Sequence, residues 1–214
     1  FALVSTPAVT SRITFLDKSK ESVSRALAVV CVPLAAAVAV YTGILLSAAP
    51  SIPLWGTWLL PALFAVSAFD TGVAAIAIVV AVLEKDESAS KFGIVLEGIT
   101  ACLIAVESVV LAVFLNTMLG GTASEALAAG IVVEGEVSVA FWTFVVAFGL
   151  AVPFVAALAQ IVMARKGRHS KWIAIGAAAC VLVGGFALRF VVLSAGIHGI
   201  VLSPDALQAV SGVV

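Results

Sequence analysis

Five long runs of apolar residues, separated by short polar segments, form the main pattern of this sequence. Each run has about 20 residues or more, the length that an α-helix needs to cross the hydrocarbon core of a bilayer. We therefore predict an all-α integral membrane protein, a bundle of five transmembrane helices with spans at about 26–48, 55–83, 93–118, 138–164 and 172–197. A polar lead-in at 1–25 precedes this transmembrane domain (26–197), and a tail at 198–214 follows it.

The positions of the basic residues predict the orientation of the bundle. All Lys and Arg residues except Arg189 lie before span 1, between spans 2 and 3, or between spans 4 and 5. Because cytoplasmic loops retain Lys and Arg, we expect the N-terminus inside and the C-terminus outside the cytoplasmic membrane of a prokaryote. Tryptophans lie at the span ends, as an aromatic belt at the membrane interface requires: Trp55, Trp58 and Trp142 outside, and Trp172 inside.

The segment between spans 3 and 4, residues 120–136, is predicted to be an outer loop. It carries Glu125, Glu134 and Glu136 and no basic residue. After the lead-in it is the largest segment expected outside the membrane. We therefore predict it as a docking edge for a partner.

Composition excludes the soluble classes. Hydrophobic residues make up 63% of the chain and charged residues 11%, with a mean hydropathy of +1.26, whereas soluble domains are roughly half apolar and a quarter charged. The net charge of −1 indicates no particular partner. We expect the lipid bilayer, and no nucleic acid, as a partner.

The apolar runs carry no spacing of Cys or His residues that is typical of a redox-metal site. Cys31, Cys102 and Cys180 have no CxxC or similar spacing, so no iron–sulfur cluster is predicted. A transmembrane haem needs paired histidines within the spans, whereas His169 lies in an inner loop and His198 just beyond span 5. We therefore expect no haem and no metal site, and His198 is either an interfacial residue or a ligand contact.

Arg189 is the one basic residue inside an apolar run, in the stretch GGFALRFVVLSAGIHG at 184–199. A guanidinium in hydrocarbon costs from a few to about ten kcal/mol, so it is expected to be paired or functional. At 1.5 Å per residue, Asp70 and Glu107 lie near the bilayer middle, and Arg189 and Tyr41 lie towards the outer face. Asp70 or Glu107 is thus the expected partner of Arg189, either to fix helix register or in a proton path or ligand lining.

Two polar stripes accompany these charges. Glu97, Thr100, Ile104 and Glu107 follow helical spacing along span 3 and would connect the inner face to the membrane middle. Together with Asp70, Glu97 and Glu107 are therefore the candidates for a proton path. Ser67, Asp70, Thr71 and Ala74 share one face of span 2, which borders a cavity or makes hydrogen bonds between helices.

Four segments together resemble the membrane subunits of the NrfD and polysulfide reductase type: YTGILLSAAPSIPLW (41–55), LLPALFAVSAFDTG (59–72), FWTFVVAFGLAVP (141–153) and GGFALRFVVLSAG (184–196). The resemblance covers spans 1, 2, 4 and 5 in order. Each motif is short and hydrophobic, and it is the four in sequence that make the match specific.

This resemblance implies a quinone- or quinol-interacting anchor subunit of a respiratory oxidoreductase complex, not catalytic alone. Such subunits exchange electrons with a docked ferredoxin-like iron–sulfur subunit, which serves a molybdopterin enzyme or a multihaem cytochrome. Tyr41 of the YTG motif is then a candidate to bind a quinone carbonyl, and Arg189 matches the Arg of the last-helix pattern, with His198 a further quinone-binding candidate. Asp70 stands at a position where many relatives are expected to have an uncharged residue. The resemblance does not distinguish menaquinone from ubiquinone as the ligand.

Two other functions remain open from the residues alone. One is a proton- or ion-translocating bundle or transporter without a redox role, in which Pro153 and Gly184–Gly185 would break helices. The other is a purely structural anchor. Because family members usually have further spans before the YTG helix and this chain begins at Phe1, we expect a fragment, a processed chain or a split form.

Overall fold

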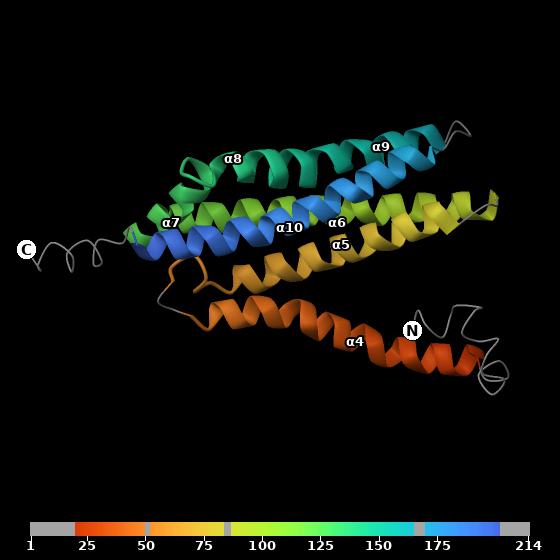
Figure 1. Cartoon of the computed structure of the whole chain (residues 1–214), viewed down its shortest axis with the longest axis horizontal. Helices are drawn as coiled ribbons and strands as arrows, with labels where there is room; N and C mark the ends of the chain where they lie inside the picture. The colour runs from red at the N-terminus through yellow and green to blue at the C-terminus, as the bar shows by residue number, and fades with distance from the viewer. Residues whose placement is uncertain (1–19, 50–51, 84–86, 165–169, 202–214) are drawn as a thin grey trace, which may run out of the picture.

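The computed structural model describes residues 20–49, 52–83, 87–164 and 170–201. Within these ranges the chain forms helices and no strand, and five helical segments are long and apolar enough to cross a membrane. Successive spans run in opposite directions side by side (Figure 1). The prediction of an all-α membrane bundle with five spans is confirmed.

All four single-helix spans differ from the predicted ranges at one end or both. The helices are α4 (Lys20–Ser47), α5 (Leu59–Leu83), α6 (Glu87–Leu119) and α10 (Lys171–Val201). α4 starts inside the predicted lead-in, because the residues before the apolar run include good helix formers and no helix breaker. Trp55 and Trp58 lie in the turn before α5 rather than in the span. The rest of the lead-in and the tail after Val201 lie outside the described residues.

The fourth span is not a uniform α-helix. It consists of α8 (Ser138–Ala140), the π-helix η1 (Phe141–Ala151) and α9 (Val152–Ala164) in series. In η1 the hydrogen bonds reach five residues back, as from the Val152 N–H to the Ala147 carbonyl, and π-helices of this length are rare. α9 begins at Val152, one residue before Pro153, which has no N–H to donate.

Four of the spans close into a ring, and the fifth lies outside it. α5 packs against α6 and α10, and the η1–α9 span packs against α10 and α6 from the other side. α4 packs against α5, on the far side of the ring from η1 and α9 (Figure 1). We call the ring of α5, α6, α8–η1–α9 and α10 the four-helix bundle.

Glycines set the closest approaches between these helices. A Cβ atom built on Gly149 of η1 would lie 2.8 Å from the Cα atom of Gly184 in α10, so only glycines allow this contact. Gly43 of α4 meets Pro61 of α5 in the same way. The small residues at 184 and 185 therefore serve packing, and α10 continues through them as one helix.

The predicted outer loop is a helix for most of its length. α7 (Ala123–Val133) buries Ala128, Ala129, Ile131 and Val132 against the end of the four-helix bundle. A capping box starts it, in which the Thr122 side chain accepts from the Glu125 N–H and the Glu125 carboxylate accepts from the Thr122 N–H at 2.6 Å. This bond holds the pKa of Glu125 below its usual range. The apolar side of α7 overrode the loop prediction, and its acidic side chains stay at the surface.

Candidate functional site

A small polar cavity lies on the axis of the four-helix bundle. All four spans line it, and its volume is about 10 Å³. The polar lining consists of side chains from α5 and α6: Ser67, Asp70, Thr71 and Glu107. The apolar lining comes from η1 and α10: Val145, Gly149, Leu150, Val181, Gly184 and Gly185. The residues that the sequence singled out in spans 2 and 3 thus face one another inside the bundle.

Two carboxyl groups face each other across this cavity. Asp70 is 1% exposed and Glu107 is 6% exposed, and the two side chains are close enough to interact directly. Glu107 also faces Ser67, which is fully buried. Both acids lie near the middle of their helices and on the sides that α5 and α6 turn towards each other.

Arg189 reaches this layer from the C-terminal half of α10. Side chains on a helix point towards its N-terminus, and the Arg189 side chain follows this rule by donating from Nη1 to the Gly185 carbonyl at 2.7 Å. Its guanidinium carbon lies 5.7 Å from the centre of the Phe64 ring, a cation–π distance. Of the two expected partners, Glu107 is the acid whose charge acts on Arg189.

Glycine makes room for the guanidinium. A Cβ atom on Gly185 would meet the Thr71 methyl group and would lie 3.4 Å from Arg189 Nη1 and 3.5 Å from Ser67 Oγ. A side chain here would therefore press on Thr71 and separate α10 from α5. The second glycine of the GGFALR stretch thus lets α10 approach α5 next to the Arg189 guanidinium.

The stripe on α6 leads from this cluster towards the N-terminal end of that helix. Glu97, Thr100, Ile104 and Glu107 are all buried, at 8%, 7%, 1% and 6% exposure. The helical rise puts about 15 Å between Glu97 and Glu107, and Thr100 is the polar side chain of the stripe between them. The predicted stripe therefore faces the bundle interior, although its carboxyl groups are too far apart for a direct proton transfer.

Tyr41 lies apart from the charged cluster. It is 60% exposed on α4, whose packing partner is α5, whereas Arg189 faces the interior of the four-helix bundle. The two residues that the family resemblance paired are thus on different surfaces. His198 is in the last turns of α10, but its side chain lies outside the described residues.

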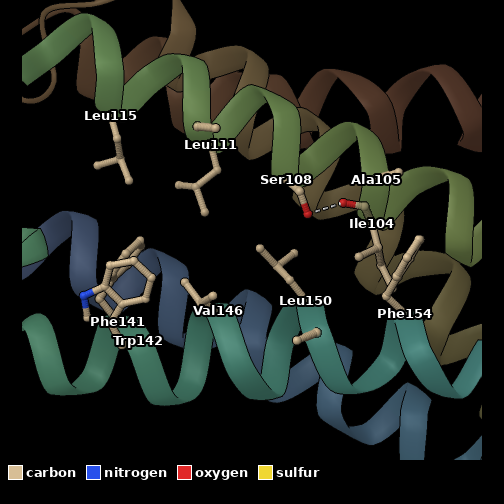
Figure 2. A pocket seen from close by; sticks show the side chains of 12 residues that line it. Ile104, Ala105, Ser108, Leu111, Leu115, Phe141, Trp142, Val146, Leu150 and Phe154 are labelled. Atoms are coloured by element: carbon tan, nitrogen blue, oxygen red, sulfur yellow. Dashed lines mark hydrogen bonds between the residues drawn. The ribbon is translucent and has the colours of Figure 1, made fainter.

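A much larger apolar groove lies on the other side of the bundle. Its volume is about 540 Å³, and α6 and the α8–η1–α9 span line it. Figure 2 shows Leu111 and Leu115 of α6 extending towards Val146 and Leu150 of the opposite span. Its polar groups are already bonded within the protein, since Ser108 donates to the Ile104 carbonyl and the Trp142 indole N–H donates to the Val133 carbonyl. Leu150 lines both this groove and the polar cavity and separates them.

Two polar side chains that join helix ends were missed by the sequence analysis. Gln160 is 1% exposed and its amide donates to the Ser170 carbonyl at 2.7 Å, linking α9 to the start of α10. At the opposite end, the Trp55 indole N–H donates to the Val192 carbonyl at 3.1 Å and its ring lies on Gly196. Gln160 could have been singled out in the sequence, because it is a single Gln in an apolar run. Nothing in the sequence distinguished Trp55 from an interfacial tryptophan.

The described residues offer no cluster of three or more His, Cys, Asp or Glu side chains that would hold a metal ion. Asp70 and Glu107 form a pair, and the third charged member of the cluster is a cation. The arrangement is therefore suited to holding and moving a proton.

Comparison with known proteins gives matches over most of the chain. The family model described as "Polysulphide reductase, NrfD" matches residues 4–200. The C subunit of the polysulfide reductase of Wolinella succinogenes is 34% identical over 178 residues, 82% of this chain and 55% of that protein. The NrfD homolog of Haemophilus influenzae is 28% identical over 163 residues, 76% of this chain and 50% of that protein. The chain thus spans about half the length of these relatives, and no solved structure matches it significantly.

Proposed function

Because the chain belongs to the NrfD/polysulfide reductase family of membrane proteins, we propose that it is the quinone-interacting anchor subunit of a respiratory oxidoreductase complex. Family membership and the five apolar helices make it an integral membrane protein with an anchor role. In the proposed complex it exchanges electrons between a quinone or quinol and a docked ferredoxin-like iron–sulfur subunit. That subunit serves a molybdopterin enzyme or a multihaem cytochrome.

The observation that carries a role beyond anchoring is the charged cluster on the bundle axis. Asp70, Glu107 and Arg189 are kept within the membrane by all four spans of the bundle, although charged groups there are costly and mark pathways for protons or ions. A merely structural anchor needs no such group. The cluster therefore supports a subunit that handles protons at mid-membrane depth.

The oxidation of a quinol requires both an electron acceptor and proton acceptors. Oxidation of a quinol to a quinone releases two electrons and two protons, so electrons pass to the iron–sulfur subunit and the protons need acceptors. Tyr41 presents its phenol on the open face of α4, where it can donate to a quinone carbonyl. The proposed proton acceptors are Asp70 and Glu107 at the centre of the bundle and Glu97 nearer the N-terminal end of α6.

Arg189 takes a different part from the one that the resemblance suggested. Its hydrogen bond to Gly185 and its proximity to Glu107 support a role in holding the acid pair. We place Arg189 in the proton path. The proposed quinone-binding residue is Tyr41, and His198 is a second candidate. The proposed setting is the cytoplasmic membrane, with the N-terminus inside and the C-terminus outside.

The test is quinol-driven turnover of the complete complex in liposomes. Tyr41→Phe and Arg189→Leu are expected to lower the rate of quinol oxidation, while the iron–sulfur subunit still copurifies. Thr117→Val is the control, because the exposed Thr117 hydroxyl donates to the Val113 carbonyl of its own helix and is not part of the cluster. Unchanged turnover in both variants would contradict the proposal, and ion flux through the isolated subunit without any redox partner would favour a transporter instead.

A further inference from the structure

The polar cavity on the bundle axis carries an inference that does not depend on quinone chemistry. We infer that this cavity is a binding site for one water molecule, held by Ser67, Asp70 and Glu107. Its volume of about 10 Å³ is near the lower end of the roughly 10–15 Å³ that a single buried water needs. The site is thus too small for an organic ligand.

Two buried atoms point to this ligand. Ser67 Oγ and Asp70 Oδ1 both border the cavity, their residues are 0% and 1% exposed, and neither atom has a hydrogen-bond partner within the protein. Buried polar groups are normally satisfied by protein or by ordered water, and in the middle of a membrane the bilayer offers them no partner. A molecule that forms hydrogen bonds with both atoms removes the free-energy cost of burying them without a partner.

Water has the right donors and acceptors for the position. It can accept the Ser67 hydroxyl proton and donate its own two protons to Asp70 Oδ1 and to the Glu107 carboxyl group. This gives three hydrogen bonds, the usual number for a buried water. Thr71 is already bonded, since it donates to the Ser67 carbonyl at 2.9 Å, and one Arg189 N–H is taken by the Gly185 carbonyl.

The contrast with the apolar groove shows why size alone does not decide hydration. The groove has about 540 Å³ but offers no free donor or acceptor in its lining, and apolar cavities stay dry. The axial cavity is far smaller but has unsatisfied oxygen atoms on α5 facing a carboxyl group on α6. The water therefore connects two spans that otherwise meet only through side-chain packing and the acid pair.

The decisive measurement is infrared spectroscopy of the intact protein in lipid, before and after exchange into heavy-oxygen water. The wild type should show an O–H stretching band that shifts on exchange and belongs to a buried water. Ser67→Val should lose this band, because the valine methyl groups fill the cavity and remove one partner. Ser108→Ala is the control and should keep it, because the Ser108 hydroxyl is bonded within its own helix.

A stability measurement covers the case in which Ser67→Val does not fold. In Ser67→Ala the water retains Asp70 and Glu107, so the unfolding temperature should stay the same or fall. A rise would overturn the inference, since deleting a dry, unsatisfied hydroxyl is stabilising. Absence of the exchangeable band in the wild type would also overturn it, as would stabilisation by sodium over potassium at equal ionic strength, which would indicate a bound cation.

Discussion

The four-helix bundle and α4 are built from equally apolar sequence but are held in different ways. In α4, 7% of the segment Val29–Ser47 is buried, against 44% of Lys171–Ile197 in α10. The bundle closes on itself through glycine contacts and an internal charged cluster, whereas α4 rests on α5 at Gly43 and Pro61. In a bilayer, apolar surface alone does not drive helices together, so packing and polar contacts decide which spans associate.

The largest effect is expected at the glycine contact inside the bundle. Gly184→Leu should destabilise the protein by about 1–3 kcal/mol or more, because even a Cβ atom there would clash with the Gly149 backbone. Thermal unfolding in detergent measures this. Gly176→Leu lies on the same helix where a Cβ atom meets nothing within 4 Å, so an equal loss in that variant would show that the contact is not what holds the bundle.

The charged cluster should show coupling on the order of 1 kcal/mol, the scale of polar contacts between membrane helices. Glu107→Gln and Arg189→Leu are each expected to lower the unfolding temperature, since each leaves the other group without its partner charge. The double variant should lose less than the sum of the two. Strict additivity would mean that Glu107 and Arg189 contribute independently.

At the edge of the bundle, Gly43→Leu should loosen α4 without unfolding the rest. The added side chain clashes with Pro61, and α4 has no other extensive packing partner among the described elements. Disulfide cross-linking between engineered cysteines on α4 and α5 should fall sharply, while the unfolding temperature of the bundle changes little. If the whole protein unfolded cooperatively in this variant, α4 would be an integral part of the folding unit and the prediction would be wrong.

The cap on α7 is expected to contribute less and only above acid pH. Because the Thr122 N–H lowers the pKa of Glu125, the carboxylate stabilises the fold above its unfolded pKa of about 4.3. That contribution is lost as pH falls through the lower, folded pKa. Unfolding temperatures of Glu125→Gln and wild type, compared from neutral to acid pH, should differ at neutral pH and converge in acid. A difference in unfolding temperature that does not change with pH would rule out the Glu125 charge as the source of the stabilisation.

Tyr41→Phe is predicted to have the smallest effect on stability, within about 0.5 kcal/mol. The phenol lies on the open face of α4, so its hydroxyl supports no internal contact. Unfolding experiments check this and give the quinol assay its meaning, because a loss of turnover without a loss of stability locates the defect in function. A marked destabilisation would place Tyr41 in a packing role.

Span number and class were predictable from the sequence because uncharged hydrophobic runs of this length are typical of transmembrane helices. The buried sides of α5 and α6 were predictable as well, since helical spacing puts Ser67 with Asp70 and Glu97 with Glu107 on single faces. The boundaries at Lys20 and Leu59 were less accurate, and 123–133 was assigned to a loop. Short apolar stretches beside acidic residues do not reveal whether a neighbouring surface exists to bury them.

The sequence by itself determined that this is a helical membrane protein with an energetically costly arginine and two mid-membrane acids, because such charges stand out against hydrocarbon composition. Only the tertiary structure decided how they combine. Glycines at 149, 184 and 185 bring η1, α10 and α5 close enough to enclose the acids. The Arg189 side chain, folded back along α10, comes within electrostatic reach of Glu107, while Tyr41 lies outside the bundle on α4. Depth follows from counting residues, but proximity depends on which helix faces touch.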